Sequence, residues 1–220
     1  VPMVVRTNMG ATRRSAAQHS QSLHALVAHI PGVKVAMPSS AYEAKGLLKT
    51  AIRDDNPVII FEDKLMYQDK APVPEGEYLL PFGKAEVLRQ GRDITFVVTS
   101  SMRQVAETAA DTLDREDISA EIIDPRTIVP FDDDSVIQSV KKTSRVIVLD
   151  EGHQSFGVTA EIAARIAEQA FYHLDAPVSR MGAMDVPVPF SPALEDLTVP
   201  TPESLAERAR AVMRGEPHGV

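Results

Sequence analysis

Short apolar runs alternate along the chain with amphipathic stretches, which is the pattern of an α/β protein with largely parallel strands. In the first third, strands are predicted over residues 3–6, 33–37 and 58–61. A short helix beginning at Ser22 and a longer one over 41–53 are predicted between them. The run 58–61 is apolar without alternation, so we expect both of its faces to be covered.

The pattern is interrupted once and then resumes. Residues 71–80 hold Pro72, Pro74 and Gly76 among charged residues without periodicity, which predicts a linker. Beyond it, strands are predicted over 85–88, 94–99, 120–123 and 145–149, and helices over 101–115, 131–141 and 157–174 and from Thr201 onward. We therefore expect two α/β units, residues 1–70 and 81–215.

Composition and charge narrow the class of protein. The 220 residues carry a net charge of −8, which argues against a nucleic-acid partner because such a partner requires a basic face. The absence of cysteine excludes disulfides and thiolate metal sites and favours a cytoplasmic protein. No apolar run approaches the roughly 20 residues that cross a bilayer. The opening residues 1–5 read like the interior of a buried strand, so we expect a further segment upstream.

Histidine is the first candidate for chemistry, because the glycine-rich phosphate loops and the nucleophile elbow are missing from the sequence. His19, His24 and His29 recur every five residues. Five residues turn a helix by about 500°, so these side chains diverge by about 140° and do not share a metal. His24 and His29 are expected on the helix surface or at an interface.

His19 stands apart because it is expected just before the helix, in a loop that follows a strand and is rich in polar residues. Residues in such loops face clefts more often than cores. A neutral imidazole can hydrogen-bond a developing oxyanion or transfer a proton. The alternative is a structural histidine that caps the helix or is held by hydrogen bonds.

Several longer motifs occur in a fixed order. They are Pro2-Met3-Val4-Val5-Arg6, Ala17-Gln18-His19-Ser20-Gln21, Pro31-Gly32-Val33-Lys34-Val35, Ala44-Lys45-Gly46-Leu47-Leu48, Ala51-Ile52-Arg53-Asp54-Asp55-Asn56-Pro57, Ile123-Asp124-Pro125-Arg126-Thr127-Ile128-Val129-Pro130 and Asp150-Glu151-Gly152. Together they resemble the beta subunit of the decarboxylating component of 2-oxo acid dehydrogenase complexes. The resemblance covers essentially the whole chain and includes the pyruvate, acetoin and branched-chain types.

The resemblance implies a fold and a reaction. Residues 1–70 correspond to the second half of a pyrimidine-type thiamin-diphosphate-binding domain, and residues 81–215 to a transketolase C-terminal-like domain with three α/β/α layers. The family decarboxylates a 2-oxo acid oxidatively, or cleaves acetoin, and acylates lipoyl groups. By resemblance, His19 reaches into the active site, where it positions intermediates and assists proton transfer. The thiamin cofactor supplies the carbanion chemistry.

The resemblance also implies partners. They are an alpha subunit that carries magnesium and the pyrophosphate site, a second beta subunit, and the lipoyl acyltransferase. The first half of the pyrimidine domain, with its cofactor-activating glutamate, is expected to be missing here, so the fragment alone is expected to be inactive. The run 185–192 resembles the pyruvate and acetoin members more than the branched-chain ones. The expected location is the bacterial cytoplasm, or the mitochondrial matrix in a eukaryote.

A second site is suggested at the end of the helix over 41–53. Free carbonyls and the negative end of the helix dipole suit a cation there, although an ordinary helix stop before Pro57 needs no ion. Family members bind structural potassium at this place. By resemblance its ligands come from Met3, Ala51, Ile52, Asp54 and Asn56.

Two further motifs receive structural interpretations. Asp124-Pro125-Arg126 is expected to tie a strand end to its neighbours through an ion pair. The run 151–157 is expected to be a loop between a strand and a helix that serves packing and subunit contacts, without a catalytic role for His153.

Two other functions stay open. One is a different thiamin enzyme with the same domain pair, such as a transketolase or a deoxyxylulose-phosphate synthase. The other is a noncatalytic module that dimerises and docks the acyltransferase through residues 80–215.

Overall fold

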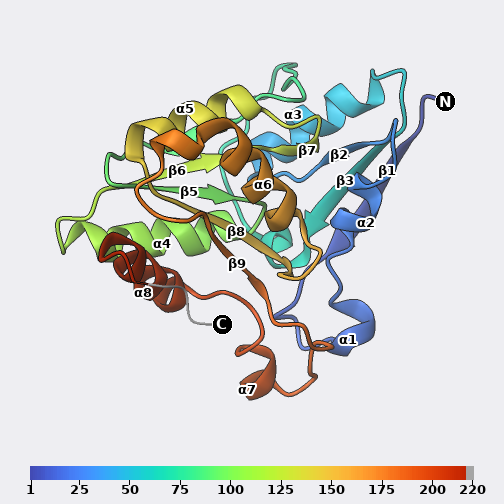
Figure 1. The fold of residues 1–220 in the computed structure, drawn as a ribbon. Helices are drawn as coiled ribbons and strands as arrows, with labels where there is room; N and C mark the ends of the chain where they lie inside the picture. Colours follow the sequence, from blue (N-terminus) through green and yellow to red (C-terminus); the bar gives the residue numbers. More distant parts are fainter. Residues whose placement is uncertain (217–220) are drawn as a thin grey trace.

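Two β-sheets, each with helices on both faces, make up the chain (Figure 1). A computed structural model describes residues 1–216. The first sheet has the order β1 (Val4–Met9), β3 (Val58–Asp63), β2 (Lys34–Ala36) and β7 (Thr127–Val129). The first three strands are parallel, and β7 runs antiparallel to β2.

Helices cover both faces of the first sheet. They are α2 (His24–Ala28) and α3 (Ala41–Ile52). The short helix α1 (Ala16–His19) and the 3₁₀ helix η1 (Lys64–Gln68) belong to the segments that follow β1 and β3. On one face, Val58 and Ile60 of β3 pack with Leu47 of α3. On the other face, Phe61 packs with Val27 of α2. The expectation that β3 is covered on both sides is therefore confirmed.

The second sheet is the middle of three layers, as expected. Its order is β4 (Glu86–Arg89), β6 (Ala120–Asp124), β5 (Ile94–Val98), β8 (Val146–His153) and β9 (Ser179–Ala183). The helices α4 (Met102–Asp114) and α8 (Pro202–Met213) cover one face, and α5 (Asp133–Thr143) and α6 (Val158–Ala170) cover the other. The short elements η2 (Phe171–His173) and α7 (Pro192–Glu195) complete this part.

The structure differs from the sequence-based expectations in several elements. The strand β7 belongs by sequence to the second unit but completes the first sheet by pairing with Val35 and Ala36. Neither β7 nor β9 was predicted, because each is short and lacks a continuous apolar run. The run 151–157 is not entirely a loop, since β8 continues through His153, which pairs with Ala183. At the other end, β1 begins only at Val4, and Val1 is exposed.

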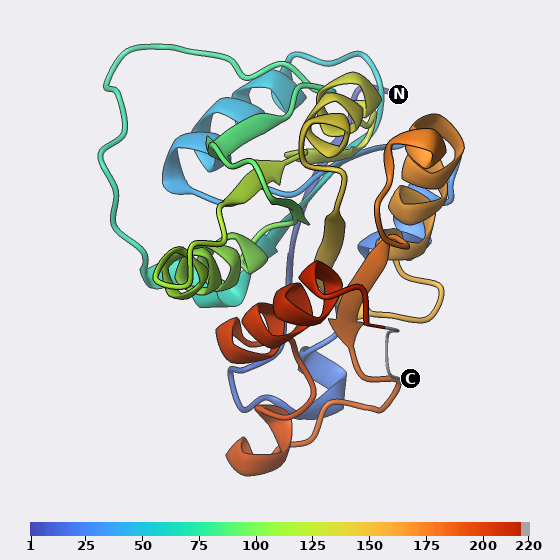
Figure 2. The ribbon, with the colours of Figure 1, turned by 60° about the vertical axis from the view of Figure 1, so that its left-hand side comes forward.

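The segment expected to be a linker returns onto the first unit. It swings out as a long arc in Figure 2 and carries no helix or strand over residues 71–80. The ring of Tyr78 stacks on Tyr42 of α3 at 4.6 Å between centroids, and the side chain of Leu80 is buried against the same helix. A Cβ on Gly46 would lie 2.6 Å from Leu80, so a glycine is needed there. The segment therefore packs on α3 for part of its length.

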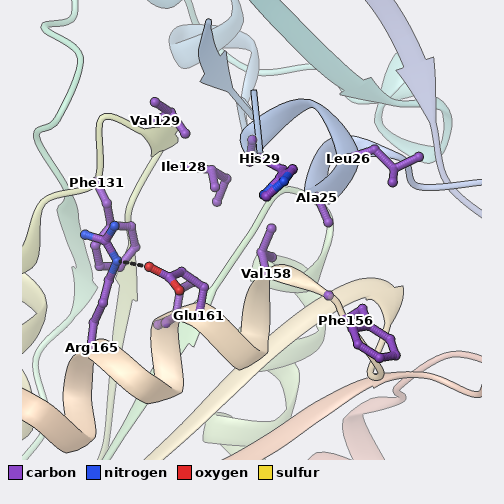
Figure 3. A pocket seen from close by; sticks show the side chains of 13 residues that line it. Ala25, Leu26, His29, Ile128, Val129, Phe131, Phe156, Val158, Glu161 and Arg165 are labelled. Carbon is purple, nitrogen blue, oxygen red and sulfur yellow. Dashed lines mark hydrogen bonds and ion pairs between the residues drawn. The ribbon is translucent and has the colours of Figure 1, made fainter. Parts of the chain in front are cut away.

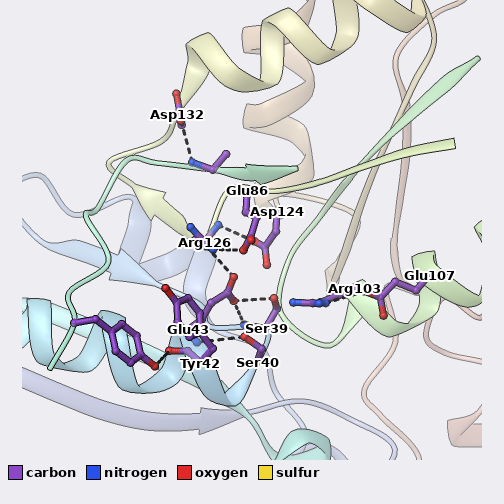
Figure 4. Close-up of polar contacts among 12 residues, drawn as sticks. Ser39, Ser40, Tyr42, Glu43, Glu86, Arg103, Glu107, Asp124, Arg126 and Asp132 are labelled. Atoms are coloured by element: carbon purple, nitrogen blue, oxygen red, sulfur yellow. Dashed lines mark hydrogen bonds and ion pairs between the residues drawn. The ribbon is translucent and has the colours of Figure 1, made fainter. Parts of the chain in front are cut away.

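Arg126 joins the two sheets, which confirms the expected ion pair (Figure 4). Its Nε donates a hydrogen bond to Glu43 of α3 at 2.8 Å, and its Nη2 donates one to Glu86 of β4. Glu43 is itself buried and accepts from the backbone and the hydroxyl of Ser39. One guanidinium thus satisfies carboxylates from both units.

Asp124 lies beside this ion pair and is fully buried. Its Oδ1 accepts from the Arg126 backbone N–H at 2.7 Å, while its Oδ2 has no hydrogen-bond partner among the described residues. Burial, followed by the negative charge of Glu43, raises the pKa of Asp124 to about 7. Asp124 therefore keeps its proton in the folded state to near neutral pH.

The substitution Asp124→Asn is expected to improve stability at alkaline pH. The unfolded chain releases the Asp124 proton near pH 4 and the folded chain only near pH 7, so ionisation destabilises the fold as the pH rises between these values. From about pH 5 to about pH 8, the wild type should lose roughly 2–3 kcal/mol of unfolding free energy relative to the variant. Urea unfolding at both pH values measures this difference. The exposed control Asp117→Asn should show the same pH dependence of the unfolding free energy as the wild type. If Asp124→Asn and the wild type lose the same unfolding free energy between the two pH values, the raised pKa of Asp124 is contradicted.

Candidate active site

The segment that connects β1 to α2 carries His19 and lies at the carboxyl edge of the first sheet. It leaves β1 at Met9, next to the end of β3 at Asp63, with which Met9 is in register. In open α/β sheets, ligands bind at this edge. A hollow of 220 Å³ lies at the same edge, lined among others by Ser40, Glu62 and Tyr67.

His19 is the last residue of α1 and not a loop residue ahead of a helix, because residues 16–19 form one short helical turn. Its side chain is exposed, and no hydrogen bond engages the imidazole among the described residues. Its backbone carbonyl accepts a hydrogen bond from Lys64, the first residue of η1. The imidazole is therefore free for a ligand while its backbone is held.

His24 is found at an interface, which was one of the two expectations for it. It is completely buried between the two units, and its Nε2 lies 2.9 Å from Oδ2 of Asp150 on β8. Asp150 also accepts hydrogen bonds from the Thr99 hydroxyl and, at 2.8 Å, from the Gly152 N–H. Burial alone would raise the pKa of Asp150, but His24 and these donors bring it below its ordinary value.

Two more buried carboxylates of the second unit contact the segment before His19. Glu151 accepts a hydrogen bond from the Ala11 backbone N–H. Burial, together with a hydrogen bond to Asp63 and the negative charge of that residue, raises the pKa of Glu151 well above its ordinary value. Glu195, on α7, accepts from the backbone N–H and the guanidinium of Arg14 at 3.1 and 2.8 Å. The second unit thus encloses this segment with acidic side chains.

His29 lies apart from these groups. It is exposed and lines a groove of about 560 Å³ between α2, β7 and α6, together with Leu26, Phe131 and Phe156 (Figure 3). The polar rim of the groove is formed by Glu161 and Arg165, whose side chains are paired at 2.8 Å. Most of the other side chains that line the groove are apolar.

The residues expected to bind potassium lie together at the end of α3. The carbonyl oxygen of Ala51 accepts a hydrogen bond from the backbone N–H of Asp54. Oδ1 of Asp54 accepts hydrogen bonds from the backbone N–H and the side-chain amide of Asn56, both at 2.9 Å. The carbonyl oxygen of Met3 accepts a hydrogen bond from the backbone N–H of Val58, which lies two residues after Asn56. Ile52 is exposed at the same turn.

A protein cation already contacts this turn. The hydrogen bond of Asp54 Oδ2 with Lys34, followed by those from Asn56, lowers the pKa of Asp54 to about 2. The oxygen-rich turn fits a potassium ion in its donor chemistry, but Lys34 competes with it for Asp54.

Within residues 1–216, no cluster of three or more histidine and acidic side chains is arranged to hold a metal ion. None of the helices described there is long and apolar enough to cross a membrane.

The sequence did not point to the acidic groups that surround the histidine segment. Asp150 and Glu151 were noted only as parts of a motif, and Glu195 was not noted at all. An acidic pair at the end of an apolar strand, directly after Leu149, was the one available signal. Glu195 lies in a proline-rich stretch without periodicity, and nothing in that stretch indicated burial.

Fold and site define the class of protein. Residues 1–70 match the family "Transketolase, pyrimidine binding domain", and residues 83–205 match "Transketolase, C-terminal domain". The chain belongs to this transketolase-type family. A solved split-gene transketolase, an inactive beta4 tetramer, superimposes with a TM-score of 0.78 over 97% of this chain and 67% of that one. Its sequence identity of 22% supports the fold alone.

Within the family, the sequence is similar to beta subunits. It is 45% identical over 217 residues to the acetoin:2,6-dichlorophenolindophenol oxidoreductase subunit beta of Bacillus subtilis, covering 99% of this chain and 63% of that protein. It is 44% identical to the pyruvate dehydrogenase E1 component subunit beta of Rickettsia felis, covering 96% and 65%. These findings confirm the resemblance drawn from the motifs. The chain spans somewhat less than two thirds of the length of these relatives.

The substitution Asp150→Asn is expected to destabilise the chain by about 3 kcal/mol, because it removes one partner of a buried pair. Urea unfolding at neutral pH measures this loss. The loss should shrink as the pH falls below about 4, since the stability from a lowered pKa is present above the ordinary value and disappears on protonation. The exposed control His29→Gln should leave the unfolding free energy nearly unchanged. Equal stability of Asp150→Asn and wild type would rule out an energetic role for the His24–Asp150 pair.

Proposed function

We propose that this chain serves as the beta-subunit part of a thiamin-diphosphate-dependent decarboxylating enzyme of the 2-oxo acid dehydrogenase type, with pyruvate or acetoin as substrate. The observation that carries the proposal is the free imidazole of His19 on a backbone held at the carboxyl edge of the pyrimidine-type sheet. The similar proteins are named as subunits of an acetoin oxidoreductase and of pyruvate dehydrogenase, which supports the same reaction class.

The residues described here supply one wall of a cofactor site. The hollow at the carboxyl edge measures 220 Å³, which is less than the roughly 300 Å³ or more of ordinary cofactor pockets. The rest of the site would come from the first half of the pyrimidine domain and from partner chains. We assign the pyrophosphate and magnesium to an alpha subunit and include a second beta subunit and a lipoyl acyltransferase in the assembly. By analogy with the relatives, the assembly is placed in the bacterial cytoplasm or the mitochondrial matrix.

Thiamin diphosphate, when bound, stabilises the carbanion that decarboxylation leaves behind. The contribution of this chain is then a proton-carrying group at a fixed place. His19 accepts a proton and, once protonated, donates it, and it hydrogen-bonds the oxygen of the acyl group during its transfer to a lipoyl arm. Lys64, which holds the His19 carbonyl, restricts the position from which the imidazole acts.

The substitution His19→Gln tests this assignment in the full-length beta subunit, assembled with its alpha partner, thiamin diphosphate and magnesium. Lipoyl acylation is expected to fall at least about 100-fold, since general acid–base groups contribute that much. The matched control His29→Gln, in the groove beside α6, should retain activity. Unchanged acylation in His19→Gln would overturn the role, and a fully folded but inactive wild-type assembly would favour a noncatalytic docking module.

We further propose that the turn after α3 binds a structural potassium ion through oxygens of Met3, Ala51, Ile52, Asp54 and Asn56. The cluster of carbonyl and carboxamide oxygens beside an ionised Asp54 supports this site. The ion would bind in competition with the Lys34 ammonium and would stabilise the turn without entering the reaction.

Thermal unfolding in potassium chloride and in choline chloride of equal ionic strength tests the potassium site. The midpoint is expected to be about 3–5 °C higher in potassium, since a ligand that binds only the folded state stabilises it. Asp54→Asn should abolish the difference, while the exposed control Asp117→Asn keeps it. Equal midpoints for the wild type in the two salts would exclude the site.

A further inference from the structure

The backbone between β1 and α1 alternates in handedness. Gly10, Thr12, Arg14 and Ala16 have φ values of 105°, 63°, 57° and 57°. Side-chain-bearing residues rarely adopt positive φ, and a β-branched residue such as Thr12 does so least readily. The segment would not keep this shape without contacts that hold it.

Alternating handedness directs successive N–H groups toward one concave side, where they bind anions. Two of these N–H groups donate to carboxylates of the second domain. Ala11 donates to Glu151, and Arg14 donates to Oε2 of Glu195 at 3.1 Å. The contacts that hold this segment therefore come from acidic side chains far along the chain.

The side chain of Arg14 strengthens the second of these contacts. Its Nη1 lies 2.8 Å from Oε2 of Glu195, and its two terminal nitrogens contact the two oxygens of Asp196 at 2.6 and 3.1 Å. The short helices α1 and α7 both lie at the lower end of the molecule in the two ribbon views (Figures 1 and 2). Arg14 thus joins the histidine segment to α7.

Glu195 is the buried member of this group. Its exposed fraction is 0%, whereas Asp196 is exposed, and its Oε1 has no hydrogen-bond partner among the described residues. A buried carboxylate is costly without a partner, and Arg14 is the one cation that an ion pair places on it within residues 1–216. The strained segment and the buried carboxylate therefore stabilise each other.

We propose that Glu195 is a positioning residue for His19: by binding the backbone and side chain of Arg14, it fixes the segment that presents the imidazole. Glu195 acts at a distance along the chain and touches no substrate. The catalytic consequence rests on the proposed function of His19, while the effect on the shape of the segment does not.

Hydrogen–deuterium exchange tests the effect on shape in the chain itself. Glu195→Gln is expected to raise the exchange of amides 10–20 about tenfold while amides of α4 exchange as in the wild type. Arg14→Asn removes the guanidinium but retains a residue that tolerates positive φ, so it separates loss of the ion pair from backbone strain. Arg14→Asn should raise the exchange of the same amides. In the double variant of Glu195→Gln and Arg14→Asn, exchange should be no faster than in either single variant.

The control is Glu116→Gln, which removes a carboxylate from a two-pronged pair with Arg210 elsewhere on the surface. It should leave amides 10–20 unchanged. Unchanged exchange of these amides in Glu195→Gln overturns the proposal, and so does an increase spread evenly over the whole chain, which would indicate a general loss of stability.

Kinetics of the assembled enzyme separate this proposal from the proposed function. Glu195→Gln should lower kcat about tenfold and leave KM within about twofold, because a displaced His19 weakens the reaction step and not substrate binding. Arg14→Lys keeps the positive charge but loses the two-pronged guanidinium, so its kcat should lie between those of the wild type and Arg14→Asn. If the segment loosens but His19→Gln retains full activity, the positioning stands and the function assigned to His19 fails.

Discussion

A carboxylate removed from water must find a partner, and this constraint governs how the two domains meet. Asp150, Glu151 and Glu195 of the C-terminal domain are all buried against the segment that leads from β1 to α2. Each finds its partner in the pyrimidine-type domain, as an imidazole, a backbone N–H or a guanidinium. The same logic recurs at Arg126, where one guanidinium serves Glu43 and Glu86. The domain contact is therefore polar at the positions that determine its geometry.

The order of helices and strands could be predicted because it follows from local periodicity. The helix α3 and the strands β3 and β5 lie where their apolar patterns indicated, and α8 begins at Pro202, directly after Thr201. The short strands β7 and β9 could not be predicted in this way. Neither strand contains a continuous apolar run, and the place of each depends on an edge that another part of the chain supplies.

The site was predictable to a similar extent. The family motif around His19 identified the candidate, but its exposure and the hydrogen bond from Lys64 came only from the structure. The spacing argument assigned His24 to a helix surface or an interface, yet it did not foresee that His24 pairs with Asp150. Burial of a charged side chain depends on two surfaces meeting, and one stretch of sequence does not contain that information. Glu195 illustrates this most clearly, because nothing near it in the sequence indicates a buried residue.

The strand β7 has a consequence for how the chain is made. Residues 1–70 contain three strands of the first sheet, but the neighbour that pairs with the outer side of β2 is residues 127–129. During synthesis, β2 therefore presents an unpaired edge until more than half of the chain has emerged from the ribosome, and exposed strand edges invite pairing with other chains. The pyrimidine-type domain is finished by a piece of its successor, so the boundary seen in the sequence does not mark the boundary of a unit that folds alone. A gene division at that boundary would leave the first product with an incomplete sheet and the second with an unpaired strand β7.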